Sequence, residues 1–191
     1  MDSSNNAAKV KVVGVGGAGE NAINDMKQSD KISDVELIAI NTDKQDLERS
    51  LTQSRVLLGE GTGAGADPEK GKNAAKESEE KIREVLKGTD MLFITAGMGG
   101  GTGTGASPIV AEVARGMGIL TVAVVTKPFE FEGPLKKSNA EMGIENLRKH
   151  VDTLIAIPNE KLFELPNISI TLMNAFKEAN SVLRVGIKGI S

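Results

Sequence analysis

The stretch of this 191-residue sequence most suited to chemistry is residues 97–105, in which six of nine residues are glycine. An apolar run, residues 91–96, precedes it, and a helix-like apolar pattern follows. Glycine lets backbone N–H groups approach a phosphate closely, and the N-terminus of a helix adds a positive dipole end. A flexible linker would be rich in serine and glycine and would lack apolar flanks. The stretch therefore predicts a loop that holds phosphate groups.

Glycine is concentrated at two further places. The chain has 22 glycines, whereas average usage predicts about 13. Fourteen of them fall in three clusters, at residues 14–19, 59–65 and 97–105. Three such clusters indicate one site that the backbone approaches from three sides.

The first cluster, taken alone, fits a dinucleotide-binding fingerprint. Gly14, Gly16 and Gly19 match G-x-G-x-x-G between a predicted strand and a predicted helix. That fingerprint expects an acidic residue at the end of the second strand, but Asp43 stands a few residues late. The stronger Gly/Thr loop favours a triphosphate, and the P-loop motif G-x-x-x-x-G-K-[ST] does not occur. An NAD-binding oxidoreductase domain stays as the alternative.

Alternating strands and helices must position these clusters. Strands are expected at 9–15, 36–40, 55–58, 91–96, 120–126 and 153–158. Helices are expected at about 21–29, at 67–87, from near Pro108 to 116, from after 133 to 149, at about 160–164 and from about 171. This order predicts an α/β fold, a three-layer, Rossmann-like arrangement with a mainly parallel sheet and helices on both faces.

Composition narrows the class of protein. The chain has no cysteine, a net charge of −3 and no polybasic block, so we expect no thiolate chemistry and no nucleic-acid partner. No apolar run approaches the roughly 18 residues of a membrane span, and residues 1–8 lack a signal-peptide pattern. We expect a cytoplasmic protein that does not insert into the membrane. Its expected parts are a disordered tail (1–8), a nucleotide-binding domain (9–170) and a helix (171–191) that would be truncated before a second domain.

Residues 100–105, Gly-Gly-Thr-Gly-Thr-Gly, resemble the glycine-rich signature of the tubulin/FtsZ superfamily, and their context resembles the FtsZ family of bacterial cell-division GTPases. Seven ordered motifs carry the resemblance over nearly all of residues 9–191. They are 13–19 with Asn21, 39–43, 64–66 with 68–69, 95–98, 124–129 with 131–133, 151–154 with 157–159, and 189–191. The resemblance implies binding of GTP or GDP, with Mg²⁺ held through the nucleotide phosphates and not by side chains directly, and filament formation by the full-length protein at the division site.

The resemblance also implies roles for individual residues. Those implied to bind the nucleotide are Gly17, Ala18, Gly19, Glu20, Asn21, Ala64, Gly65, Gly97, Gly100, Gly101, Thr102, Gly103, Thr104, Glu132, Lys136, Asn159, Phe176 and Asn180. Among them, Ala64 and Gly65 would approach the γ-phosphate, Glu132 the ribose, and Asn159 and Asn180 the guanine. Asp43 would lie near the phosphates and Mg²⁺ as an accessory residue. From helical periodicity alone, Phe176 is equally well explained as a residue of the apolar core. Without the resemblance, Glu132 would be explained as a solvent-exposed charge in a loop.

Three features depart from the usual family pattern. The segment before the second glycine cluster is about four residues short, Lys136 replaces the usual arginine, and Glu20 places a carboxylate beside the phosphates, which it should repel. In the family, the acidic residues that activate water lie beyond the central helix, and residues 1–191 do not reach them. We therefore expect binding but very slow hydrolysis by this chain, which would be monomeric or would cap filament ends. A non-catalytic capping module is a further alternative.

Overall fold

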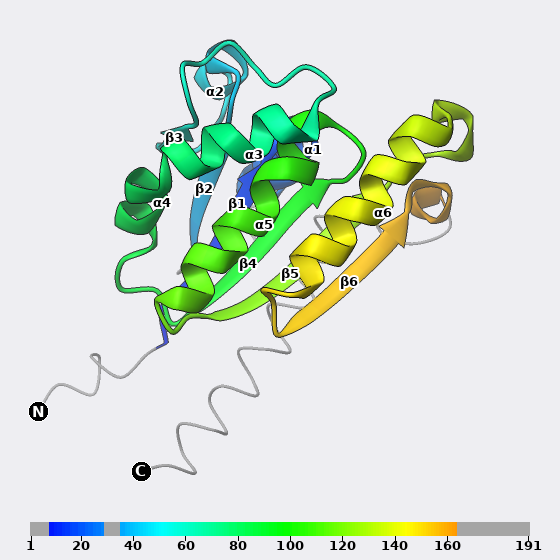
Figure 1. The fold of residues 1–191 in the computed structure, drawn as a ribbon. Coiled ribbons are helices and arrows are strands. Elements are labelled where there is room, and N and C mark those ends of the chain that lie inside the picture. The colour runs from blue at the N-terminus through cyan, green and yellow to red at the C-terminus, as the bar shows by residue number, and fades with distance from the viewer. Residues whose placement is uncertain (1–7, 29–34, 164–191) are drawn as a thin grey trace, which may run out of the picture.

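A single parallel sheet forms the centre of the structure, a computed structural model that describes residues 8–28 and 35–163. Six strands pair in parallel in the order β3-β2-β1-β4-β5-β6 (Figure 1). The strands are β1 (Val10–Val15), β2 (Val35–Asn41), β3 (Ser54–Leu57), β4 (Met91–Gly97), β5 (Leu120–Lys127) and β6 (Thr153–Pro158). All six predicted strands are confirmed, each within one residue or two at its ends.

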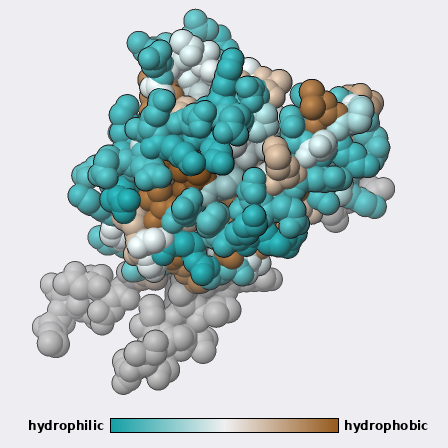
Figure 2. Space-filling model, viewed as in Figure 1, coloured by the Kyte–Doolittle hydropathy of each residue, from teal (hydrophilic) through white to brown (hydrophobic). Residues whose placement is uncertain are grey.

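Helices flank the sheet, which confirms the predicted fold class. They are α1 (Gly16–Gln28), α2 (Lys44–Glu48), α3 (Pro68–Glu77), α4 (Glu79–Leu86), α5 (Gly101–Gly116) and α6 (Pro134–Arg148), with short 3₁₀ turns at Glu130–Glu132 and Asn159–Phe163. In Figure 1, α3, α5 and α6 lie across the front of the sheet, while α1 lies behind it. The face seen in Figure 2 is mostly hydrophilic, apart from a hydrophobic hollow.

Two apolar cores hold these layers together. Along β1, Val13 and Val15 join the core beneath α3, α4, α5 and α6, whereas Val10 and Val12 join the core beneath α1. Successive side chains of a strand point to opposite faces, so a run such as residues 91–96 must be apolar on both sides when both faces are covered. This explains why β4 is a nearly continuous apolar run, and why β1 carries only one charged residue, Lys11, near its start.

Several helix predictions were wrong in detail. α1 begins at Gly16 rather than near residue 21, and α5 begins at Gly101, so that Pro108 lies inside it and not near its start. The helix expected at 67–87 is two helices that meet at Ser78, although Asp67 does cap the first one and Pro68 does open it. α2 was not predicted. Residues 171–191 and the tail at 1–7 lie outside the described residues.

None of the helices in the described ranges is both long and apolar enough to cross a membrane.

Candidate functional site

The candidate site is a cavity of about 440 Å³ at the carboxyl ends of the strands. It opens where the strand order reverses, between β1 and β4, which is where open α/β sheets bind ligands. Eight of the residues that line it are glycines. At these positions the wall is main chain, which presents N–H and C=O groups rather than side chains.

The first turn of α1 forms one wall. Gly16 has a φ of 77°, which turns the chain sharply from β1 into the helix. Gly14 and Gly19 pack backbone against backbone: a Cβ on Gly14 would collide with the carbonyl oxygen of Gly19, and one on Gly19 would lie 2.6 Å from that of Thr95. Gly17 and Ala18 are left facing the cavity. The three motif glycines thus serve the turn and the close helix–strand packing.

The first turn of α5 forms the adjacent wall. Gly100, Gly101, Thr102 and Gly103 line the cavity, and a Cβ on Gly103 would collide with the carbonyl oxygen of Gly97 at the end of β4. The first N–H groups of a helix have no partner within the helix. Two helices therefore direct such groups, and the positive ends of their dipoles, into one cavity.

The second glycine cluster closes a third side. Gly59, Gly61, Gly63 and Gly65 all have positive φ, between 58° and 88°. The Gly63 N–H donates to Thr42 O at 3.0 Å, and the Lys44 N–H donates to Gly61 O at 3.1 Å. The shortened segment is thus fixed to the end of β2, with Ala64 and Gly65 at the cavity.

The corner between β2 and α2 supplies polar side chains. Asn41, Thr42, Asp43 and Asp46 line the cavity, and the Thr42 and Thr102 hydroxyls lie 2.7 Å apart. The Asp43 carboxylate accepts from the backbone N–H groups of residues 45 and 46 as the N-cap of α2. The Asp43 carboxylate is therefore already used in part to cap α2, whereas the ribose-binding carboxylate of a dinucleotide site is free to accept from the ribose hydroxyls.

The opposite rim carries the remaining charges. The Lys136 ammonium lies 3.4 Å from Glu132 Oε1, and Glu132 Oε2 accepts from the backbone N–H of Phe129 at 2.7 Å. Asn159 lines the same rim, just after β6. Among the described residues that line the cavity, Lys136 is the one cationic side chain, and Asp43, Asp46 and Glu132 supply carboxylates.

The structure brings most of the predicted site residues together. Those that line the cavity are Gly17, Ala18, Ala64, Gly65, Gly97, Gly100, Gly101, Thr102, Gly103, Glu132, Lys136 and Asn159, with Asp43. Gly19, Glu20 and Thr104 are buried behind its wall, and Asn21 is exposed without lining it. Phe176 and Asn180 lie outside the described residues.

Sequence reasoning missed several lining residues: Gly16, Asn41, Thr42, Asp46, Gly63, Thr126 and Pro128. Most of them stand at or just after the end of a strand. Because the carboxyl ends of parallel strands meet at one edge of the sheet, a position at the end of a predicted strand could have indicated that a residue lines the site.

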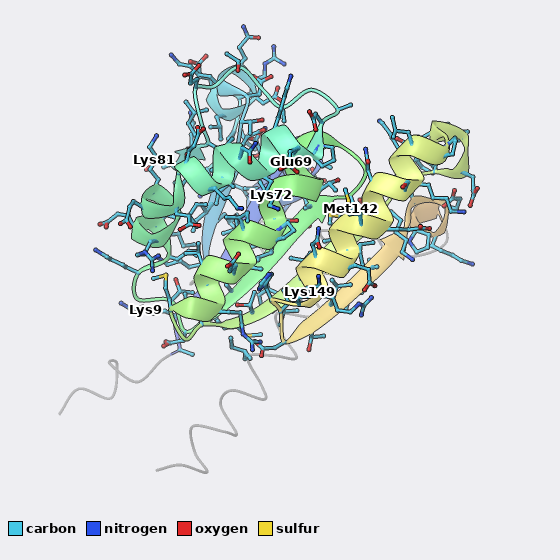
Figure 3. All side chains as sticks on the ribbon, viewed as in Figure 1. Lys9, Glu69, Lys72, Lys81, Met142 and Lys149 are labelled. Atoms are coloured by element: carbon cyan, nitrogen blue, oxygen red, sulfur yellow. The ribbon has the colours of Figure 1, made fainter. Side chains whose placement is uncertain are left out.

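A second hollow of about 330 Å³ lies between α3, α5 and α6. Glu69 and Lys72 on α3, Met142 on α6 and Lys149 just after the end of α6 flank it (Figure 3). Its charges are of both signs, so they favour no particular ligand.

Comparisons with known proteins agree with this geometry. Residues 9–167 match the Tubulin/FtsZ family, GTPase domain. The chain is 49% identical to FtsZ of M. jannaschii in a structure of the empty dimer, with a TM-score of 0.79, over 96% of this chain and 54% of that one. A W319Y mutant of that protein gives 48% identity and a TM-score of 0.81, over 98% and 57%.

A more distant match is CetZ2 from Haloferax volcanii, in a GTPγS-bound protofilament, at 26% identity and a TM-score of 0.73, over 81% of this chain and 50% of that one. The chain thus spans about half the length of the solved structures that it matches. The family match covers most of the sequence, and the fold and the glycine-lined cavity are consistent with it. This chain belongs to the tubulin/FtsZ family and contains its GTPase domain.

Proposed function

We propose that the cavity binds the phosphates of GTP or GDP, and that the chain is the nucleotide-binding part of a filament-forming, cytoplasmic cell-division GTPase. One observation carries the proposal: residues of the first turns of both α1 and α5 line the same cavity, where the N–H groups of a first helical turn have no partner within the helix. A phosphate chain needs several donors around it, which main-chain groups supply without steric bulk. The CetZ2 relative, a GTPγS-bound protofilament, supports the same ligand class.

Guanine recognition would fall to the rim. The Asn159 amide offers both a donor and an acceptor to a base edge. Glu132 would accept from the ribose hydroxyls, with Lys136 beside it to offset its charge. Phe176 and Asn180 remain proposed base contacts by resemblance alone.

A divalent cation fits this site. The cavity wall carries three carboxylates and one ammonium, so an added polyphosphate would meet net negative charge. Mg²⁺ prefers oxygen ligands and commonly binds through nucleotide phosphates, so we propose that the phosphates hold it, with Asp43 nearby. When bound, Mg²⁺ would neutralise phosphate charge.

The test is a pair of titrations on the purified 191-residue chain, with fluorescent GDP and with NADH, each with Mg²⁺ and with EDTA. We expect saturable GDP binding that weakens in EDTA and is displaced by GTP but not by ATP. NADH should not bind. Binding of NADH without binding of GDP would instead support the oxidoreductase alternative and overturn the proposal.

A further inference from the structure

Glu20 is a buried carboxyl group directly behind the cavity, and the proposed function gives it no task. It lies on α1, two residues beyond Ala18, and is 5% exposed. The Asn41 side chain, which lines the cavity and is 2% exposed, donates from Nδ2 to Glu20 Oε1 at 3.4 Å. Burying a carboxyl group without compensating hydrogen bonds or charges is unfavourable, so the position of Glu20 must be stabilised by its neighbours or serve a function.

The hydrogen bonds fix which way the Asn41 amide faces. Its Oδ1 accepts from the backbone N–H of Thr42 at 2.8 Å and is 3.3 Å from that of Asp43. Backbone N–H groups can only donate, so Oδ1 must face them and Nδ2 must face Glu20. Glu20 is thus the acceptor that completes this arrangement, and the Thr42 hydroxyl, on the residue whose N–H the Asn41 amide accepts from, lies 2.7 Å from that of Thr102.

The charges around Glu20 are unbalanced. Asp43 and Asp46 act on it from the β2–α2 corner, and Arg55 acts on it from β3. Burial raises the pKa of Glu20, the hydrogen bond from Asn41 and the Arg55 charge oppose this, and the Asp46 and Asp43 charges raise it further. The Arg55 guanidinium also donates to the carbonyl oxygens of Ser50 and Thr52, so Glu20 has no exclusive cationic partner in the described part of the chain.

We propose that Glu20 is a positioning residue of the nucleotide site: it holds the Asn41 amide in place and takes up a proton when nucleotide phosphates bind. The inference rests on the proposed function. Phosphates in the cavity would add negative charge close to a carboxylate that is already poorly solvated, which favours its neutral form. A protonated carboxyl group still has an oxygen that accepts from Asn41, so the position of the amide survives proton uptake.

The sign of the linkage follows from these charges. Binding that raises the pKa of Glu20 must be tighter at lower pH, by about tenfold for each unit of difference between the free and bound forms. The effect appears as pH falls through the range between those two pKa values. The nucleotide phosphates titrate as well, so only the difference between variants isolates Glu20.

The experiment measures the affinity for GDP between about pH 5 and pH 8 for wild type, Glu20→Gln, Glu20→Leu and Asp25→Asn. Gln keeps the acceptor oxygen and cannot ionise, so Glu20→Gln should bind GDP at least as tightly as wild type at pH 8 and with a shallower pH dependence. Leu removes the acceptor, so Glu20→Leu should bind roughly tenfold more weakly. Asp25, exposed on the same helix, should behave as wild type when changed to Asn.

Two outcomes would overturn the inference alone: a wild-type pH dependence in Glu20→Gln, or Glu20→Gln binding as weakly as Glu20→Leu. Failure of wild type to bind GDP at any pH would overturn the proposed function and this inference together. If Glu20→Leu does not fold, the Gln variant still decides. A carboxyl NMR titration of Glu20, expected to move to higher pH when GDP is added, gives an independent readout, and an unmoved midpoint would contradict the proton uptake.

Discussion

At the scale of single residues, glycines decide whether the cavity can form. A side chain at Gly103 would collide with the Gly97 carbonyl oxygen, so the first turn of α5 would have to move away from β4. We therefore expect Gly103→Ser to abolish measurable GDP binding through displacement of this turn, as well as through crowding of the phosphate itself. Titration with fluorescent GDP checks this, and unchanged affinity would contradict it.

The control lies on the same helix. Gly116 is the last residue of α5, and a Cβ there would have no neighbour within 4 Å. Gly116→Ala should leave GDP affinity unchanged and alter stability by no more than about 1 kcal/mol.

The Thr42–Thr102 contact is a second residue-scale prediction. Valine at either position keeps the shape and removes the hydroxyl, so each single change should destabilise the fold. The double variant should lose less than the two single losses combined, by about 0.5–1.5 kcal/mol, if the 2.7 Å contact is a hydrogen bond that matters. Urea unfolding of the four proteins measures this coupling, and strictly additive losses would argue against it.

At the scale of elements, three strands share a polar contact near the amino ends of β1 and β2. The Lys11 ammonium on β1 contacts Glu36 on β2 at 3.1 Å and donates to the carbonyl oxygens of Val85 and Lys87 at the end of α4. The Ser54 hydroxyl on β3 donates to Glu36 at 2.7 Å. Partial burial alone would raise the pKa of Glu36, but these partners together lower it.

A lowered carboxyl pKa gives a stability that depends on pH. The contribution of Glu36 is present above its ordinary pKa and is lost as pH falls through the lowered value of the folded protein. Wild type should be more stable than Glu36→Gln near neutral pH, by about 0.5 kcal/mol because the side chain is partly exposed, and the difference should disappear in acid. Thermal unfolding at several pH values tests this.

The matched control for this test is Glu80→Gln. Glu80 is largely exposed and pairs only loosely with Arg83, at 3.7 Å. The stability of this control variant should follow that of the wild type at every pH. A Glu36→Gln variant that behaved in the same way would show that the contact on the sheet contributes nothing.

The elements also show what the sequence could reveal. Strands such as β5 were predictable because a short, continuous run of apolar and β-branched residues next to glycine is typical of a buried strand. The start of α5 was not, because Gly101–Thr104 have poor helix propensity and are helical only where packing on Gly97 and Gly71 requires bare backbone. The five-residue helix α2 is too short for any apolar periodicity, and only its Asp43 cap gives a local signal.

The candidate site, like the fold, was predictable from the sequence only in part. Glycine clusters indicated phosphate-binding turns, but the Asn41–Glu20 contact joins residues 21 apart and needs the β1–β2 pairing to bring them together. Glu20 was expected to lie beside the phosphates; in the structure it is buried and is not among the residues that line the cavity. No periodic pattern distinguishes a residue at the surface of a cavity from one just beneath it.

At the scale of the whole molecule, we predict that the 191-residue chain binds nucleotide but neither assembles nor turns it over efficiently. By resemblance, water activation requires acidic residues that a neighbouring subunit contributes, and the 191-residue chain spans about half the length of the relatives that it matches. Light scattering with GTP should show no robust assembly, and phosphate release should stay far below that of a full-length relative. Substoichiometric amounts added to such a relative should reduce its polymer if the chain caps filament ends. Vigorous turnover or assembly by the chain alone would contradict this prediction.

The glycines in the cavity wall have a practical consequence for observing ligands. Eight lining residues are glycines, from all three glycine clusters of the chain, and glycine amides occupy their own region of a nitrogen–proton correlation spectrum. A ligand that enters the cavity should therefore perturb that sparse region selectively. The backbone of this protein contains its own set of spectroscopic probes, and each wall of the pocket can be followed separately without an attached dye or a mutation.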